Sequence, residues 1–279
     1  MLNIRNLTKK YGSLTAVNEL NLEIPKGEFF GLLGPNGAGK STTIRMISTL
    51  TPSTSGDIII NNKNMDRNLK EVKMKIGVVP QGNNLEVEMT AWENLELHGR
   101  LYNMPKDVRR KRIEELLEFT ELTKRADDLV KGFSGGMKRK LMIARALMHN
   151  PDLLLLDEPT VGLDANARRK MWDLLKTLKE QGLTVLLTTH YIEEAEVLCD
   201  RVGIIDGGRL MQLNSPKKLI EEVGKYTVEY FENGETKEEF FQQREDAAKF
   251  AAELQGSVNI RPSNLEDVFI KLTNRRVGE

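Results

Sequence analysis

A glycine-rich segment near the start of the sequence ends in a lysine and two hydroxyl-bearing residues. It fits the pattern G-x-x-x-x-G-K-[ST] and lies between an apolar run, residues 29–33, and a helical pattern that begins at Ser41. Glycine lets the backbone wrap closely around an anion, so that successive N–H groups and the helix start point toward it. This context argues against a chance glycine loop. It predicts a phosphate-binding loop in which Lys40 reaches the β- and γ-phosphates and Ser41 ligates Mg²⁺. The predicted nucleotide-binding residues of the loop are Gly34, Asn36, Gly37, Ala38, Gly39, Lys40, Ser41 and Thr42.

An acidic pair, Asp157 and Glu158, follows the apolar run 153–156. The carboxyl edge of a parallel sheet is where ligands bind, and an acidic residue that ends a buried strand lies at this edge. We expect Asp157 to hold Mg²⁺ through water and Glu158 to polarise the attacking water. A strand that ends in Asp-Glu can equally be a solvated strand end when it is taken alone. Beside the phosphate loop, the pair is the expected second half of the site.

A third segment, Phe133-Ser134-Gly135-Gly136-Met137, opens an amphipathic helical pattern that runs to about residue 146. Ser134 is a natural N-cap, and the two glycines expose the first N–H groups of the helix. The segment therefore predicts a second anion site, separate from the phosphate loop. Seen alone, it could also be an ordinary capped helix start.

The elements around these segments alternate between strand and helix patterns. Short apolar runs at 29–33, 76–79, 153–156, 184–188 and 202–205 predict buried strands, and helical patterns separate most of them. This alternation indicates an α/β fold with a mostly parallel core sheet. The first 28 residues indicate an N-terminal β subdomain, residues 90–150 a helical insertion, and the tail a small α+β appendage.

The composition is that of an ordinary soluble globular protein. Lys+Arg and Asp+Glu both number 41, so the formal net charge is zero and the basic excess of a typical nucleic-acid binder is missing. One cysteine, Cys199, cannot form an intramolecular disulfide. The first residues lack the apolar stretch of a secretory leader, and the apolar runs are too short to cross a bilayer. We expect an intracellular protein that other chains hold at any membrane.

The order of these motifs, together with Gln81, Gly162-Leu163-Asp164 and His190, resembles the ATP-binding cassette (ABC) ATPases over residues 2 to about 213. The resemblance implies the P-loop NTPase fold of that family: a mostly parallel core sheet, an antiparallel N-terminal β subdomain and a helical insertion. It also implies domains at 1–220, with the helical part at about 90–150, and at 221–279. For the appendage we expect a dimer contact or a regulatory cap.

The resemblance also assigns roles that the residues alone leave open. It implies that Gln81 touches Mg²⁺ and the attacking water and begins a loop that senses the membrane partner. His190 would contact the γ-phosphate, and Tyr11 would stack on adenine with Val17 packing beside it. Taken alone, Gln81 could be a turn residue, His190 a histidine with purely structural bonds, and Tyr11 an aromatic at the edge of the core.

The family implies that the site is shared between two subunits. Ser134, Gly135 and Gly136 of one subunit would bind the γ-phosphate held by the loop of the other, and Asp164 would lie at the interface. The catalytic set is then Glu158, His190 and Gln81; the metal set is Ser41, Gln81 and Asp157. The cofactors are ATP and Mg²⁺.

The sequence departs from the commonest family pattern at three positions. Phe133 and Met137 stand where Leu and Gln are usual, and Val161 stands where Ser often precedes Gly-Leu-Asp. Backbone N–H donors and Ser134 are unaffected, so we expect activity to survive. These variants, and the tail segment 265–269, resemble the daunorubicin-resistance branch of exporters.

The functional prediction is the ATP-hydrolysing subunit of an ABC exporter. Its partners would be a second ATP-binding subunit, as a homodimer or a heterodimer, and a separate membrane permease that places it on the cytoplasmic face; no nucleic-acid partner is expected. A soluble ABC ATPase acting on ribosomes or nucleic acid is the alternative, but the long coiled coil and second cassette typical of such proteins are missing. A non-hydrolysing regulatory module is disfavoured by Glu158 and His190. Drug, lipid, ion and peptide cargoes all stay open.

Overall fold

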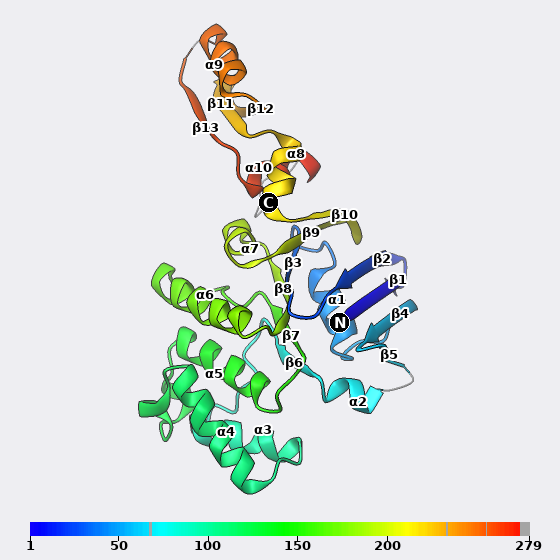
Figure 1. Ribbon diagram of the computed structural model, residues 1–279, viewed down its shortest axis with the longest axis vertical. Helices are drawn as coiled ribbons and strands as arrows, with labels where there is room; N and C mark the ends of the chain where they lie inside the picture. The colour runs from blue at the N-terminus through cyan, green and yellow to red at the C-terminus, as the bar shows by residue number, and fades with distance from the viewer. Residues whose placement is uncertain (67–68, 233, 255, 274–279) are drawn as a thin grey trace.

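A six-stranded sheet forms the centre of the chain, in the order β10-β9-β3-β8-β7-β6 (Figure 1). The computed structural model describes residues 1–66, 69–232, 234–254 and 256–273. All pairs in the sheet are parallel except β9–β10, which forms the hairpin that Gly207-Gly208 predicts. The predicted mostly parallel core is therefore confirmed. The strands are β3 (Phe29–Leu33), β6 (Ile76–Val79), β7 (Leu153–Asp157), β8 (Thr184–Thr189), β9 (Arg201–Asp206) and β10 (Arg209–Asn214).

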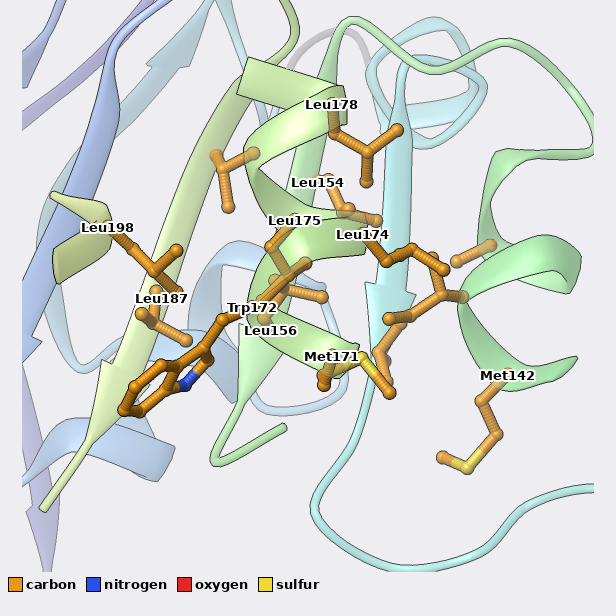
Figure 2. Packing of buried hydrophobic residues seen from close by; sticks show 14 of the residues in the cluster. Met142, Leu154, Leu156, Met171, Trp172, Leu174, Leu175, Leu178, Leu187 and Leu198 are labelled. Carbon is orange, nitrogen blue, oxygen red and sulfur yellow. The ribbon is translucent and has the colours of Figure 1, made fainter. Parts of the chain in front are cut away.

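The apolar run of β3 is buried on both faces, because alternate side chains enter two different cores. Phe29 and Leu33 belong to the core beneath α5 (Gly135–Leu147), α6 (Ala165–Glu180) and α7 (Ile192–Leu198). Phe30 and Leu32 belong to the core on the opposite face, which α1 (Lys40–Ile47) covers. Figure 2 shows the first core, where the apolar side chains of α6 lie against the leucines of β7.

The N-terminal strands form a second, antiparallel sheet in the order β2-β1-β4-β5. Its inward side chains, among them Leu2, Ile4 and Ile60, share a core with α1 and the central sheet. The sheet therefore covers the side of the molecule that carries the glycine-rich loop, and the predicted antiparallel subdomain is confirmed. The strands are β1 (Leu2–Tyr11), β2 (Leu14–Ile24), β4 (Ser55–Ile60) and β5 (Lys63–Asn64).

Between β6 and β7 the chain forms the predicted helical insertion. Thr90 accepts a hydrogen bond from Glu93 N (3.1 Å) while the Glu93 carboxylate accepts from Thr90 N (2.8 Å), which is the capping box expected at this helix start. The helices are α3 (Ala91–Leu101), α4 (Lys106–Phe119) and α5, with short 3₁₀ turns at Thr123–Arg125 and Val130–Gly132; α2 (Leu69–Lys73) precedes β6.

The C-terminal part contains an antiparallel sheet, β12-β11-β13, on which α9 packs, and this sheet projects from the core in Figure 1. Its last helix, however, returns to the core: Leu265, Val268 and Phe269 pack with Leu219 in the main apolar cluster. The predicted α+β appendage is thus present, and its end is anchored to the ATPase body; Asn233 of the predicted turn lies outside the described residues. The elements are α8 (Pro216–Val223), β11 (Tyr226–Glu232), β12 (Glu235–Phe241), α9 (Arg244–Glu253), β13 (Val258–Pro262) and α10 (Leu265–Thr273).

Among the described residues, no helix has both the length and the apolar character needed to cross a bilayer.

An aromatic cluster joins the helical insertion to the central sheet. Tyr102 stacks on His149 with ring centroids 3.8 Å apart, and His98 lies beside both rings. His149 Nε2 donates to the carbonyl oxygen of Ile76 on β6 (3.0 Å). Burial lowers the pKa of His98 to about 4 and likewise that of His149, with Arg145 and Arg112 respectively adding to the effect. Both imidazoles are therefore neutral at physiological pH.

These histidines predict a loss of stability on mild acidification. Between about pH 6.5 and pH 4 an unfolded chain protonates both histidines while the folded chain does not, so stability falls as the pH is lowered. We expect the denaturant midpoint to drop between pH 7 and pH 5, and to drop less in a His98→Gln/His149→Gln variant, since an amide cannot take up the proton. Equal slopes in the two proteins would rule out the histidines as the cause.

Candidate active site at the carboxyl edge of the sheet

The glycine-rich loop joins β3 to α1 and is shaped by positions at which only glycine fits. Gly39 has φ +105°, and a Cβ atom there would collide with the carbonyl oxygen of Ala16. A Cβ atom on Gly34 would collide with the Ile205 carbonyl oxygen in the same way. The hairpin between β9 and β10 supports the loop from behind, because Gly208 N donates to Ala38 O (3.1 Å). The first turn of α1 and its unpaired N–H groups are thereby fixed at the edge of the sheet.

Lys40 begins α1 and is almost fully buried, at 4% exposed. Its ammonium group donates to Gly34 O (2.6 Å) and Pro35 O (3.0 Å) and lies 3.9 Å from Glu158 Oε1. Burial lowers the pKa of Lys40, while Glu158 and Asp157 oppose that change. The two carboxylates therefore favour the charged form that a phosphate group would bind.

Asp157 ends β7 and faces the loop. Its Oδ1 atom accepts hydrogen bonds from Ser41 Oγ (3.0 Å) and Thr188 Oγ1 (2.6 Å). The parallel register pairs Asp157 with Thr188, so the C-terminal end of β8 holds this carboxylate in place. The structure thus brings two of the predicted metal-site residues, Ser41 on α1 and Asp157 at the end of β7, into direct contact.

Glu158 follows Asp157 with a left-handed backbone, at φ +49°. Such a conformation costs a non-glycine residue about 1–3 kcal/mol and is held here by Glu158 N donating to Thr188 O (3.0 Å). Its Oε2 atom lies 3.0 Å from His190 Nδ1 and 3.4 Å from Gln81 Nε2. Since a carboxylate can only accept, His190 Nδ1 is the donor in this pair. The three residues predicted as catalytic therefore meet at one carboxyl group.

A second group of predicted site residues lies apart from the first. Ser134 caps α5 by accepting from Met137 N (3.3 Å), and Asp164 caps α6 by accepting from Ala167 N (2.8 Å). Both caps are exposed, as is Gly135. Ser134, Gly136 and Asp164 line a shared pocket of about 220 Å³ between the two helix starts. This face points to solvent and is open to a ligand or to another chain.

The remaining predicted nucleotide contacts differ in exposure. Tyr11 is 46% exposed, with Lys9 Nζ 4.9 Å from the centroid of its ring. Asn36 is exposed and Thr42 is half-buried on the first turn of α1. Val17 is fully buried beside Gly39, so in this conformation it supports the loop and presents no face to a base.

A comparison with protein-family models matches residues 17–161 to the family described as ABC transporter. The chain belongs to the ABC transporter ATP-binding family. It is 43% identical to the Nod factor export ATP-binding protein I of Cupriavidus metallidurans, over 100% of this chain and 99% of the relative. It is also 46% identical to the linearmycin resistance ATP-binding protein of Bacillus subtilis, over 82% of this chain and 73% of the relative. The family prediction made from the motifs is confirmed.

Solved ABC cassettes share the fold. A dimeric cassette in a post-hydrolysis state, bound to ADP and phosphate, is 36% identical and matches 77% of this chain and 98% of its own, with a TM-score of 0.69. A cassette of an ABC transporter complex from Clostridium perfringens is 29% identical, with 79% and 90% coverage and a TM-score of 0.73. The predicted fold is therefore confirmed, and the chain is an ATP-binding ATPase.

One residue of the ABC site escapes the motif analysis. Arg139, on α5, reaches across to donate to Pro80 O (2.8 Å) and Gln81 O (3.0 Å), and its Nη2 lies 3.5 Å from Glu158 O. Burial lowers its pKa, while Asp157 opposes that change. Arg139 therefore fixes the backbone of two predicted catalytic residues to the helix that Ser134 caps. Its position five residues after Ser134 is the only sequence signal that points to it.

The loop geometry predicts a graded response to glycine substitution. Gly39→Ala places a methyl group against Ala16 O at a positive φ, so we expect ATP affinity to fall at least about tenfold, or about 1.4 kcal/mol. Gly37→Ala also has a positive φ but open space around the new methyl group, and it should lose less. Titration calorimetry with each folded variant measures its ATP affinity and so ranks the two substitutions. A Gly39→Ala protein with wild-type ATP affinity would contradict the prediction.

Proposed function

We propose that this ABC ATPase powers export as a dimer docked beneath a separate membrane permease on the cytoplasmic face. The observation that carries the proposal is the separation of the two anion-binding groups. The phosphate loop gathers with Asp157 and Glu158 at one place, while Ser134 caps an exposed helix start elsewhere. A site that needs both groups requires a second chain. Relatives that are named as export and resistance ATP-binding proteins support the direction of transport.

We place Mg²⁺ between the loop and β7. Among the described residues, no group of three or more His, Cys, Asp or Glu side chains suits a metal, so the ion would rely on a hydroxyl, a carboxylate and phosphate oxygens. Ser41 Oγ and Asp157 Oδ1, 3.0 Å apart, are oxygen donors of the kind that Mg²⁺ prefers, and they fit this role. When bound, the ion would neutralise charge on the β- and γ-phosphates.

The chemistry assigned to the chain's own residues is hydrolysis of the γ-phosphate bond. Glu158 accepts a proton from a water molecule as the water oxygen bonds to the γ-phosphorus, and the bond from that phosphorus to the β–γ bridging oxygen breaks. ADP and phosphate are the products. His190 fixes the direction of the Glu158 carboxyl group by hydrogen bonding to it, and Lys40 binds the phosphates.

Dimer closure follows from the exposed caps. In a two-fold contact, Ser134, Gly135 and Gly136 of each chain bind the γ-phosphate held by the other chain, with Asp164 at the contact. ATP then binds the closed dimer better than the open one and shifts the population toward it. Hydrolysis separates the γ-phosphate from the rest of the nucleotide and weakens the closed state. A homodimer satisfies this arrangement with two identical sites.

The loop that begins at Gln81 is tied to the helical insertion, which supports its role in sensing the permease. Arg139 holds Gln81 O, and Arg145 on the same helix donates to Asn84 O (2.5 Å). Further along, Lys131 N donates to Val87 O (2.9 Å). A partner that moves the helical insertion would therefore displace Gln81 relative to Glu158. The comparisons give no support to the alternative of a ribosomal or nucleic-acid ATPase.

Glu158→Gln tests the proposed base and identifies the partner. An amide cannot take up the proton, so we expect turnover to fall about 10²-fold or more, with ATP binding retained and an ATP-dependent dimer on gel filtration. The tagged variant, incubated with ATP and native membranes, should recover a polytopic membrane protein, and bait without ATP is the control. Recovery of ribosomal proteins without a permease, or near wild-type turnover, would overturn the proposal.

Ser134→Arg tests the shared site. The added side chain occupies the exposed start of α5, so it should block the partner's phosphate without touching the chain's own loop. We expect unchanged ATP affinity of the monomer and loss of the ATP-dependent dimer, measured by light scattering in the Glu158→Gln background. The matched control is Lys138→Arg, which places an arginine on the same helix at a half-buried position without adding charge. Normal dimerisation of Ser134→Arg would refute the model.

A further inference from the structure

A fully buried carboxyl group lies behind the active site and has no part in the chemistry described above. Glu194 is on α7, four residues after His190, and is 0% exposed. Its Oε1 atom accepts from the indole Nε1 of Trp172 on α6 (3.2 Å). Figure 2 shows Trp172 reaching from α6 toward Leu187 of β8 and Leu198 of α7. Burying a carboxyl group costs free energy unless hydrogen bonds compensate, so the partners of Glu194 define what it can do.

Two threonines connect this acid to the catalytic segments. Thr189 immediately precedes His190, and Thr160 lies two residues after Glu158. Both hydroxyl groups lie near the Glu194 carboxyl group, and both side chains are buried. Within the described residues, Glu194 Oε2 and Thr160 Oγ1 are each without a partner in good hydrogen-bond geometry. Because a threonine hydroxyl group can donate to a carboxylate oxygen, a hydrogen bond from Thr160 Oγ1 to Glu194 Oε2 would satisfy both of these buried oxygens.

We propose that Glu194 is a positioning residue for ATP hydrolysis, which links α6, the segment after Glu158 and the segment carrying His190 through hydrogen bonds. The inference rests on the catalytic roles proposed for Glu158 and His190. Glu194 touches neither the nucleotide nor the attacking water; it acts through Thr160 and Thr189.

The surroundings of Glu194 act on its pKa in opposite directions. Burial raises its pKa, while hydrogen bonds from Thr189, Thr160 and Trp172, and the charge of Arg168, oppose the rise. The carboxyl group accepts from Trp172 Nε1 at Oε1 and is placed to accept from the Thr160 hydroxyl group at Oε2. A glutamine side chain would keep the acceptor for Trp172 and, because a hydroxyl group can also accept, would donate to Thr160.

The hydrogen-bonded link through Glu194 connects the helix at the proposed dimer contact, α6, to the catalytic segments. The helix α6, which carries Trp172, starts at Asp164, the exposed cap assigned above to the partner contact. On the same helix, the Arg168 guanidinium lies 4.9 Å from the ring of Tyr191, the residue after His190. A shift of α6 on dimer closure would therefore reach His190 through Tyr191 and the loop after Glu158 through Glu194.

The test compares three single variants of the full chain by steady-state ATPase kinetics. Glu194→Ala should lower kcat at least about tenfold with KM for ATP within about threefold, because the phosphate loop lies on other elements. Glu194→Gln should retain at least about half of wild-type kcat. Leu198→Ala, a buried truncation on the same helix, is the control for lost packing, and all proteins are assayed below their measured unfolding transitions.

A double-mutant cycle tests whether Glu194 affects kcat through Thr160. Thr160→Val keeps the shape of the side chain and removes its hydroxyl group, so it should lower kcat in the same direction as Glu194→Ala. The double variant should be little worse than Glu194→Ala alone, because both changes break one link. Fully multiplicative losses would overturn a shared link.

Three other results would also overturn the inference: wild-type kcat in Glu194→Ala, a Gln variant as slow as the Ala variant, or an equal loss of kcat in Leu198→Ala. Glu158→Gln, assayed in parallel, separates this inference from the proposed function. If Glu158→Gln is inactive while Glu194→Ala is normal, only the role of Glu194 fails. If Glu158→Gln turns over normally, the proposed catalytic base fails first.

Discussion

The parallel pairing of β7 with β8, and of β8 with β3, determines where the phosphate loop, Glu158 and His190 lie. In parallel strands the carboxyl ends meet at one edge, so the loops after β3, β7 and β8 emerge together. The register pairs Asp157 with Thr188 and Leu33 with Thr189. Lys40, Glu158 and His190 then become neighbours although long stretches of chain separate them. A slip of one residue in β8 would turn Thr188 away from Asp157 and remove its hydroxyl from the site.

Much of the fold and of the phosphate loop could be predicted because the signals are local. The run at 29–33 is apolar at every position except glycine, which indicates a strand that is buried on both faces. The glycines at 34, 37 and 39 indicate the loop that follows this strand. Thr90 and Ser134 each mark the start of a helix, because their side-chain oxygens accept hydrogen bonds from backbone N–H groups three residues further along the chain.

The supporting polar residues could not be predicted, because their partners come from other elements. Arg139 sits in a helix whose polar residues look alike in sequence, and only tertiary packing turns it toward Gln81. Thr188 reads as an ordinary β-branched strand residue. Glu194 is one of several acids in 193–196, and periodicity alone does not reveal that it enters the core. In each case a sequence motif identifies the residue proposed to react, whereas the residue that fixes its position is recognised only from the tertiary structure.

The left-handed backbone at Glu158 places the stability of the main chain and the chemistry of the side chain in conflict at this position. Glycine would adopt φ +49° without steric penalty, so this replacement would relieve the main chain while removing the carboxylate that contacts both His190 and Gln81. Backbone stability alone would therefore favour glycine at residue 158. The glutamate found there stores steric strain in the main chain at the point where its carboxyl group meets His190 and Gln81.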